Sequence, residues 1–390
     1  MPSQTDIAVY LDFNATAPAR REVIDAVAET LRLGATNASS VHGPGREARR
    51  LIETARARVA DLVGAAPEQV IFTSGGTEAN NMVLGGAARA RILVSATEHS
   101  AVLRTALVRA ADCEVVPVGA DGVIDAGKLD ELLGADDTPA LVSVMAANNE
   151  TGTLQPVAEA ARLAHAHGAL MHSDAVQAAG KIDIDFGALD ADFLTLSAHK
   201  IGGPQGVGAV IARKPEELRP MILGGGQERG RRAGTENTAG IVGFGVAAEL
   251  AGRERLDAAR HTAALRDGLE ARLRAAVPKM VIYAETAERL PNTTCFTLPG
   301  VRNDTQVMAL DLAGIAVSAG SACSAGKVEP SHVLEAMGAP DAEAITAIRV
   351  SLGAETTAAE IEAFADAWLA LWARKGGGGE QAPDAASDAA

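Results

Sequence analysis

The sequence is poor in aromatic residues and in positive charge. Phe, Trp and Tyr make up 3% of the 390 residues, and 35 Lys and Arg face 50 Asp and Glu, for a net charge of −15. Single-stranded nucleic acids bind by stacking their bases on aromatic side chains, and all nucleic acids need basic contacts to phosphate. Aromatic and basic residues are both scarce in this sequence, so we expect no nucleic-acid partner.

Cysteine is also scarce, and long apolar runs are missing. The three cysteines, Cys113, Cys295 and Cys323, lie far apart and form no CxxC pair, unlike the frameworks of small secreted domains. No stretch approaches the roughly 18 apolar residues of a membrane helix, and the first residues lack the pattern of a signal peptide. We therefore expect free thiols in a cytoplasmic protein without membrane contact.

A metal site is not expected from the histidines. His165 and His167 lie two residues apart, with His172 further along the chain. Residues two apart do not share a helix face, so these side chains cannot converge on an ion as i, i+4 ligands do.

What the chain does have is an alternation of short apolar runs with amphipathic stretches. The apolar fraction of 47% supports a sizeable core, and a length of 390 residues favours two or three domains. The alternation is typical of an α/β domain with a largely parallel sheet, here residues 16–255. The expected strands are Gln69–Thr73, Arg91–Ser95, Leu141–Met145, Ala169–His172, Phe193–Leu196 and Val207–Ile211, and the expected helices between them are Glu78–Ala88, Ala101–Ala111 and Val157–His167.

From residue 256 the pattern changes to that of a smaller α+β domain, residues 256–375, which residues 1–15 are expected to join. It would hold strands at Val281–Tyr283, Thr294–Thr297 and Ile315–Ser318, and helices at 256–276, Ser331–Met337 and Ala358–Ala373. Residues 376–390 are rich in Gly, Ala, Asp and Ser with nothing to bury, and are expected to be a disordered tail.

Two segments that follow expected strands could bind a ligand. Ser74-Gly75-Gly76-Thr77-Glu78 leads into a helix, so its backbone N–H groups could cradle a phosphate, although Gly-Gly turns before helices are common. Asp174 follows the expected strand Ala169–His172, at the sheet edge where open α/β proteins bind ligands. It could pair with a protonated heteroaromatic nitrogen or simply cap the next helix.

Two further residues could react covalently. Lys200, in Ser197-Ala198-His199-Lys200 before a glycine-rich turn, could form a Schiff base if burial or His199 lowers its pKa; otherwise it is a surface lysine. Cys323 lies in a run of small residues, Ser318 to Gly326, and is expected to be an accessible thiol. Cys113 and Cys295 have apolar neighbours and are expected to be packing residues.

In this order the four signals resemble the NifS/IscS-type cysteine desulfurases, in the class-V aminotransferase branch of the fold-type I pyridoxal-phosphate enzymes. The resemblance extends from Tyr10 to Gly353. Its motifs are Ser39-Ser40-Val41-His42, Thr97-Glu98-His99, Asn148-Asn149-Glu150-Thr151-Gly152, Asp174-Ala175-Val176-Gln177, the run Gly224 to Thr235, and Ser321-Ala322-Cys323.

The resemblance implies an aspartate-aminotransferase-like fold with a seven-stranded, mostly parallel sheet, and a pyridoxal 5'-phosphate site. Lys200 would form the Schiff base, and Cys323 would attack the substrate sulfur. His99 would stack on the ring and assist as acid or base, and Asp174 and Gln177 would bind the ring. The phosphate would be held by Gly76, Thr77, Ser197 and His199. Thr235 would reach the cofactor of a second subunit, and Arg349 with Asn149 would bind the substrate carboxylate.

The implied reaction converts L-cysteine to L-alanine and leaves a persulfide on Cys323. A homodimer and a sulfur-acceptor protein, such as an iron–sulfur scaffold, are the implied partners. Selenocysteine lysis, kynurenine cleavage or transamination remain as alternative reactions, of which the last two need no thiol nucleophile. A catalytically idle scaffold is the alternative from another class.

Overall fold

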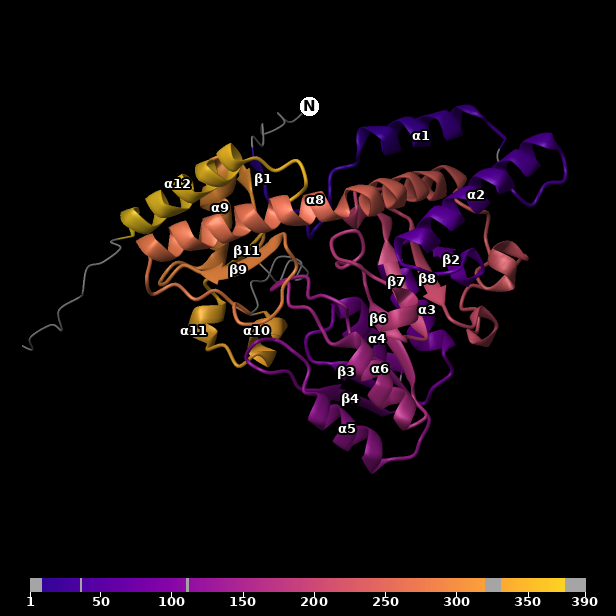
Figure 1. Ribbon diagram of the computed structural model, residues 1–390, viewed down its shortest axis with the longest axis horizontal. Coiled ribbons are helices and arrows are strands. Elements are labelled where there is room, and N and C mark those ends of the chain that lie inside the picture. Colours follow the sequence, from indigo (N-terminus) through magenta and orange to yellow (C-terminus); the bar gives the residue numbers. More distant parts are fainter. Residues whose placement is uncertain (1–8, 36, 110–111, 320–330, 376–390) are drawn as a thin grey trace, which may run out of the picture.

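The computed structural model describes residues 9–35, 37–109, 112–319 and 331–375. Within them the central feature is a seven-stranded sheet in the order β2-β8-β7-β6-β5-β3-β4 (Figure 1). Its strands are β2 (Val70–Thr73), β3 (Arg91–Ser95), β4 (Asp112–Val116), β5 (Ala140–Ser143), β6 (Leu170–Asp174), β7 (Phe193–Ser197) and β8 (Gly208–Ala212). Neighbours from β4 to β7 pair in parallel, while β8 is antiparallel to β7 and β2. The predicted fold class is confirmed.

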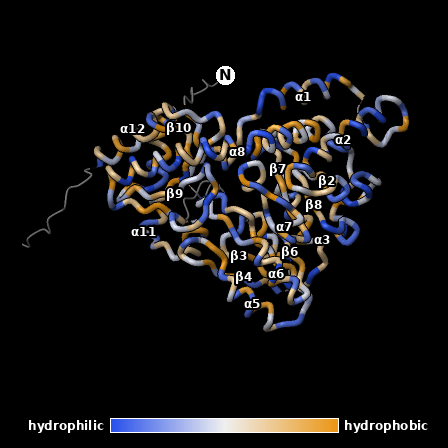
Figure 2. Tube along the Cα trace, in the orientation of Figure 1, coloured by the Kyte–Doolittle hydropathy of each residue, from blue (hydrophilic) through white to orange (hydrophobic). Residues whose placement is uncertain are grey.

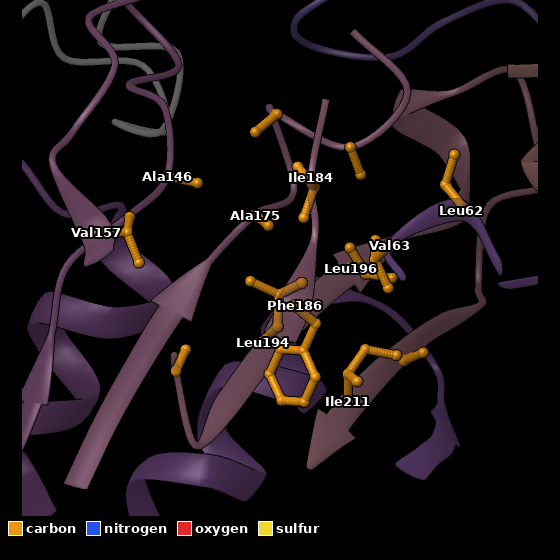
Figure 3. Packing of buried hydrophobic residues seen from close by; sticks show 14 of the residues in the cluster. Leu62, Val63, Ala146, Val157, Ala175, Ile184, Phe186, Leu194, Leu196 and Ile211 are labelled. Carbon is orange, nitrogen blue, oxygen red and sulfur yellow. The ribbon is translucent and has the colours of Figure 1, made fainter. Parts of the chain in front are cut away.

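Helices cover both faces of this sheet because successive strand residues alternate between two buried clusters. Leu194 packs into one cluster and Phe193 into the other, as the two-residue period of a strand requires. In the first cluster Phe186 lies beside Leu194 and Ile211 (Figure 3). That cluster includes α2 (Gly43–Leu62), α5 (Ala126–Ala135), α6 (Val157–Ala166) and part of α8 (Thr238–Ala276), and the other includes α3 (Gly76–Gly86) and α4 (Ser100–Arg109).

A second group of elements surrounds a separate hydrophobic cluster. There the ring centroids of Phe296 and Trp368 lie 5.4 Å apart, and Val9 and Leu11 join from the N-terminal side. In this group β1 (Val9–Tyr10) pairs with β10 (Ile315–Ala316), and β9 (Thr293–Thr297) with β11 (Ala347–Ser351). Its helices are α9 (Asn303–Leu312) and α12 (Ala358–Arg374). Helices α10 (His332–Ala336) and α11 (Asp341–Ala344) pack in a further small cluster beside it, while α1 (Arg21–Arg32) and α7 (Phe186–Leu189) belong to the larger part.

The long helix α8 connects the two parts (Figure 1). It begins after Asn237, whose side chain accepts a hydrogen bond from the Gly240 N–H, and it continues through the predicted domain boundary at residues 255 and 256. Phe244 packs in the large cluster and Leu273 in the small one. The division into two domains stays a prediction, which the two separate clusters support.

Two local features differ from the expectations. The sheet contains β4, which was not expected, and the predicted strand Val281–Tyr283 is reduced to one isolated bridge between Ile282 and Phe296.

Hydrophobic positions recur along the strands of the large sheet, with hydrophilic ones on the surrounding loops (Figure 2). Within the described residues no helix combines the length and apolar character needed to cross a bilayer.

Candidate active site

The predicted site residues meet at one edge of the large sheet. Strand β2 is antiparallel to β8, which is antiparallel to β7, so β2, β6 and β7 all end at the same edge. Ligands bind outside the carboxyl ends of strands in open α/β sheets. A cavity of about 630 Å³ opens there, and it is lined by Gly76, Thr77, His99, Asn149, Asp174, Gln177, Ser197, His199, Lys200 and Arg349.

One wall of the cavity is the N-terminus of α3. No side chain caps this helix, and its first residues, Gly76 and Thr77, line the cavity. A Cβ atom on Gly76 would lie 2.9 Å from Val176 Cγ2, so the close approach of these segments requires glycine. The open N–H groups and the positive end of the helix dipole favour an anion at this wall.

Asp174 ends β6 and is almost fully buried, with 6% of its surface exposed. Its Oδ1 accepts a hydrogen bond from the Val176 N–H at 2.9 Å, and its Oδ2 accepts one from Asn80 Nδ2 at 2.7 Å. Asp174 therefore caps a turn, whereas the alternative considered from the sequence was the cap of a helix. Gln177, three residues on, donates from Nε2 to the Asn14 carbonyl at 2.8 Å.

Lys200 lies at the end of a short 3-10 turn, Ala198–Lys200, that follows β7. Its Nζ donates to the carbonyl oxygens of Asn14 at 2.5 Å and Ala15 at 2.8 Å. The side chain is thus held inside the molecule against neutral acceptors and lines the cavity, which argues against the alternative of a solvated surface lysine.

Two histidines contribute neutral rings. Burial lowers the pKa of His99, and the Ala101 N–H donates to its Nδ1 at 3.1 Å, so the ring proton of the neutral form is on Nε2. Burial, with help from the Lys200 charge, lowers the pKa of His199 to about 4. His199 Nδ1 lies 3.1 Å from Thr16 Oγ1.

Arg349 enters the cavity from β11, on the smaller sheet. Its Nη1 donates to the Asn149 carbonyl at 2.9 Å, and its Nη2 pairs with Asp12 at 2.6 Å. Its Nε is buried and has no partner among the described residues. A guanidinium held this way keeps a fixed orientation and retains N–H groups for an anionic ligand.

Of the predicted site residues that the structure describes, Thr235 is exposed and is not in this cavity. Cys323 lies outside the described residues. Of the two cysteines expected to be packing residues, Cys295 is buried in β9 and Cys113 is partly buried at the edge strand β4.

The sequence reading missed several residues that support the cavity. Asn14 accepts from Lys200 and Gln177 through its carbonyl oxygen. Lys181 is half-buried and its Nζ donates to the side chains of Asn14 and Gln177, and burial of the amine, followed by the charges of Lys200 and Arg349, lowers its pKa well below the usual value. The spacing of four residues between Gln177 and Lys181 was a sequence signal for the contact between them.

Two more unexpected residues lie near His99. Glu98 is fully buried, and burial, followed by the nearby Asp174 charge, raises its pKa well above the usual value. His332 lines the cavity and its Nε2 lies 3.0 Å from the Glu98 carbonyl oxygen. The helical spacing of Asn80, four residues after Gly76, also indicated that it shares the cavity face.

Comparisons with known proteins agree with this geometry. Residues 9–364 match the family described as Aminotransferase class-V. A cysteine desulfurase of Cereibacter sphaeroides is 47% identical over 371 residues, covering 91% of this chain and 93% of that protein. A NifS-like protein from Rickettsia africae has a TM-score of 0.87 at 37% identity, covering 94% of this chain and 99% of its own.

A second solved structure, described as SspA in complex with cysteine, has a TM-score of 0.78 at 31% identity and covers 90% of this chain and 100% of its own. The chain belongs to the class-V aminotransferase family. Within that family, the resemblance to the NifS/IscS-type cysteine desulfurases is confirmed.

One prediction concerns His172, fully buried on β6. Burial lowers its pKa to about 3, while an unfolded histidine titrates near about 6.5. As the pH falls through this window the unfolded state binds a proton that the native state does not, so stability decreases. Between pH 7 and pH 5 the wild type should lose about 2 kcal/mol more than His172→Gln. Urea denaturation at both pH values measures this; equal losses would contradict it.

Proposed function

We propose that this protein is a pyridoxal-phosphate-dependent cysteine desulfurase. It removes sulfur from L-cysteine, releases L-alanine and leaves a persulfide on Cys323. The observation that carries the proposal is a single cavity that Lys200, Asp174, His99 and Arg349 all line. These residues supply an amine, a carboxylate, a neutral imidazole and a guanidinium, the groups that an amino acid bound to this cofactor requires.

The cavity residues fit the phosphate of the cofactor. The uncapped N-terminus of α3 presents Gly76 and Thr77, and the tight contact between Gly76 and Val176 leaves backbone rather than side chain facing the ligand. Ser197 and His199 line the same cavity. Because His199 is neutral, its ring would act as a hydrogen-bond partner rather than as a counter-charge.

The cavity residues also fit the ring of the cofactor. Asp174 would accept a hydrogen bond from the protonated ring nitrogen, Gln177 would bond the ring hydroxyl, and His99 would stack on the ring face. Lys200 would carry the Schiff base, since it lines the cavity and its amine donates to the carbonyl oxygens of Asn14 and Ala15. Bound pyridoxal phosphate would supply an electron-withdrawing ring that stabilises negative charge at the substrate Cα.

The chain's own residues would then orient the substrate and move protons. Arg349 and Asn149 would hold the carboxylate, and the Lys200 amine would take the Cα proton. His99 carries its ring proton on Nε2 and could donate it within the cavity. The Cys323 thiolate would attack the substrate sulfur, so that an S–S bond forms, the C–S bond breaks, and the carbon that keeps the electron pair is protonated to give alanine.

A homodimer is part of the proposal. Thr235 is exposed and does not line the cavity of its own chain, so it could contact a cofactor phosphate only in another copy. Its loop is held by Glu228, which forms a buried ion pair with Arg56 at 2.8 Å. A sulfur-acceptor protein, such as an iron–sulfur scaffold, is the second proposed partner, and the cytoplasm is the proposed location.

Cys323→Ser should abolish sulfide release from L-cysteine in the presence of a reductant, because serine cannot form a persulfide. The wild type should produce alanine and sulfide in equal amounts, which colorimetric sulfide assay and amino-acid analysis measure. Cys113→Ser, at the distant edge strand, is the matched control and should retain activity. Sulfide release at the wild-type rate from Cys323→Ser would refute the nucleophile, and no alanine from the cofactor-loaded wild type would point to another amino acid as substrate.

Arg349→Lys should raise KM for cysteine about 100-fold, because an ammonium cannot form the paired hydrogen bonds of a guanidinium with a carboxylate. Steady-state kinetics test this. Arg302→Lys, at an exposed ion pair with Asp304, is the control and should leave KM unchanged. An unchanged KM in a folded Arg349→Lys protein would remove Arg349 from the carboxylate site.

A further inference from the structure

Four buried side chains form a row behind Asp174. Asn80 Nδ2 donates to Asp174 Oδ2 at 2.7 Å, and Thr195 Oγ1 donates to Asn80 Oδ1 at 2.6 Å. His172 Nε2 lies 3.4 Å from Thr195 Oγ1, and Ser143 Oγ lies 2.8 Å from His172 Nδ1. Asn80, Ser143, His172 and Thr195 are each at most 1% exposed, so solvent does not compete for these hydrogen bonds.

The strand register brings these side chains together. Ser143 on β5 lies opposite His172 on β6, and Asp174 on β6 lies opposite Thr195 on β7. His172 and Asp174 are two residues apart and share one face of the sheet. Asn80 reaches that face from α3, which packs against β7. The row therefore depends on the pairing of three parallel strands and one helix.

The donors in this row all point toward Asp174. Asn80 Oδ1 can only accept, so the single Thr195 hydroxyl proton is directed to it, and Thr195 must accept from His172. Burial alone lowers the pKa of His172 to about 3, so its ring is neutral and carries its proton on Nε2. His172 Nδ1 is then an acceptor for the Ser143 hydroxyl. Aligned hydrogen bonds of this kind strengthen one another in a buried site.

The surroundings of Asp174 include a second buried carboxyl group, that of Glu98. Beside Asp174 lie Glu98 and His99, which precede α4. Burial, followed by the Asp174 charge, raises the pKa of Glu98 well above its usual value, and its Oε2 has no partner among the described residues. Asp174 accepts two hydrogen bonds, from Asn80 and from the Val176 N–H.

We propose that Ser143, His172, Thr195 and Asn80 form a one-directional hydrogen-bond chain that fixes the orientation of the Asp174 carboxyl group as an acceptor at the cavity wall. Thr195 and Asn80 are thereby positioning residues for the ring nitrogen of the cofactor. This inference rests on the proposed function for the identity of the ligand, whereas the chain itself is a property of the protein alone.

The first test replaces Thr195 with a residue of the same shape. Thr195→Val removes the hydroxyl and should weaken pyridoxal-phosphate binding about tenfold, measured by absorbance titration of the apoprotein. Thr195→Ser restores the hydroxyl and should stay within about twofold of the wild type. Thr294→Val is the control, because Thr294 is also buried in a strand and its hydroxyl has no partner among the described residues. Wild-type affinity in Thr195→Val, or equal loss in Val and Ser variants, would overturn the proposal.

The second test needs no variant of Thr195. In protein labelled with ¹⁵N-histidine, the His172 signal should be that of a neutral ring protonated on Nε2; the signal is assigned by its loss in His172→Gln. A ring protonated on Nδ1, or a charged ring at pH 7, would reverse or break the chain and overturn the proposal. A wild-type protein that binds no pyridoxal phosphate would refute the proposed function, yet this measurement would still test the chain.

Discussion

The register between β6 and β7 is the constraint on which the site depends. It places Asp174 opposite Thr195 and brings Ser197, and then Lys200, to the same sheet edge. A slip of one residue would move Asp174 to the other face of the sheet, because side chains alternate along a strand. The antiparallel pairing of β7 with β8 and the helices on both faces resist such a slip. The positions of the reactive groups thus follow from the core of the large part of the molecule.

Asn14 connects this edge to the smaller part of the molecule. Its carbonyl oxygen accepts from Lys200 and Gln177, its Nδ2 donates to Thr293 at 2.9 Å, and its backbone N–H donates to the Ser351 hydroxyl at 3.0 Å. The cavity is therefore completed by residues from both the larger and the smaller part of the molecule. The position of Arg349 depends on this contact between the two parts, because Arg349 reaches the cavity from β11 and donates to the Asn149 carbonyl oxygen of the larger part.

The sequence predicted the buried strands better than it predicted the edges and connections. Apolar runs marked β3 and β7, which are buried throughout, and β6, which is buried after its first residue. Edge strand β4 escaped because Asp112 and Glu114 interrupt its apolar pattern, which is that of an edge rather than of a buried strand. Helix α8 was predicted only from residue 256, at the expected domain boundary, although the backbone forms one helix from Thr238 to Ala276.

The site was predictable where residue order resembles a known family, and not where it depends on register. The resemblance identified Lys200, Asp174, His99 and Arg349, which the structure brings to one cavity. It gave no sign that Thr195 and His172 support Asp174, because that contact requires three strands to be paired correctly. Lys181 was also missed, because its contact with Asn14 joins segments far apart in the sequence and only its spacing of four residues from Gln177 indicated a neighbour.

The central claim is that Lys200 carries the cofactor in this cavity. The most direct measurement is reduction of the purified protein with borohydride, which fixes a Schiff base to its lysine, followed by peptide mass spectrometry. The account predicts one phosphopyridoxyl adduct, located on Lys200. An adduct on Lys181 or another lysine, or none in a protein saturated with pyridoxal phosphate, would contradict it.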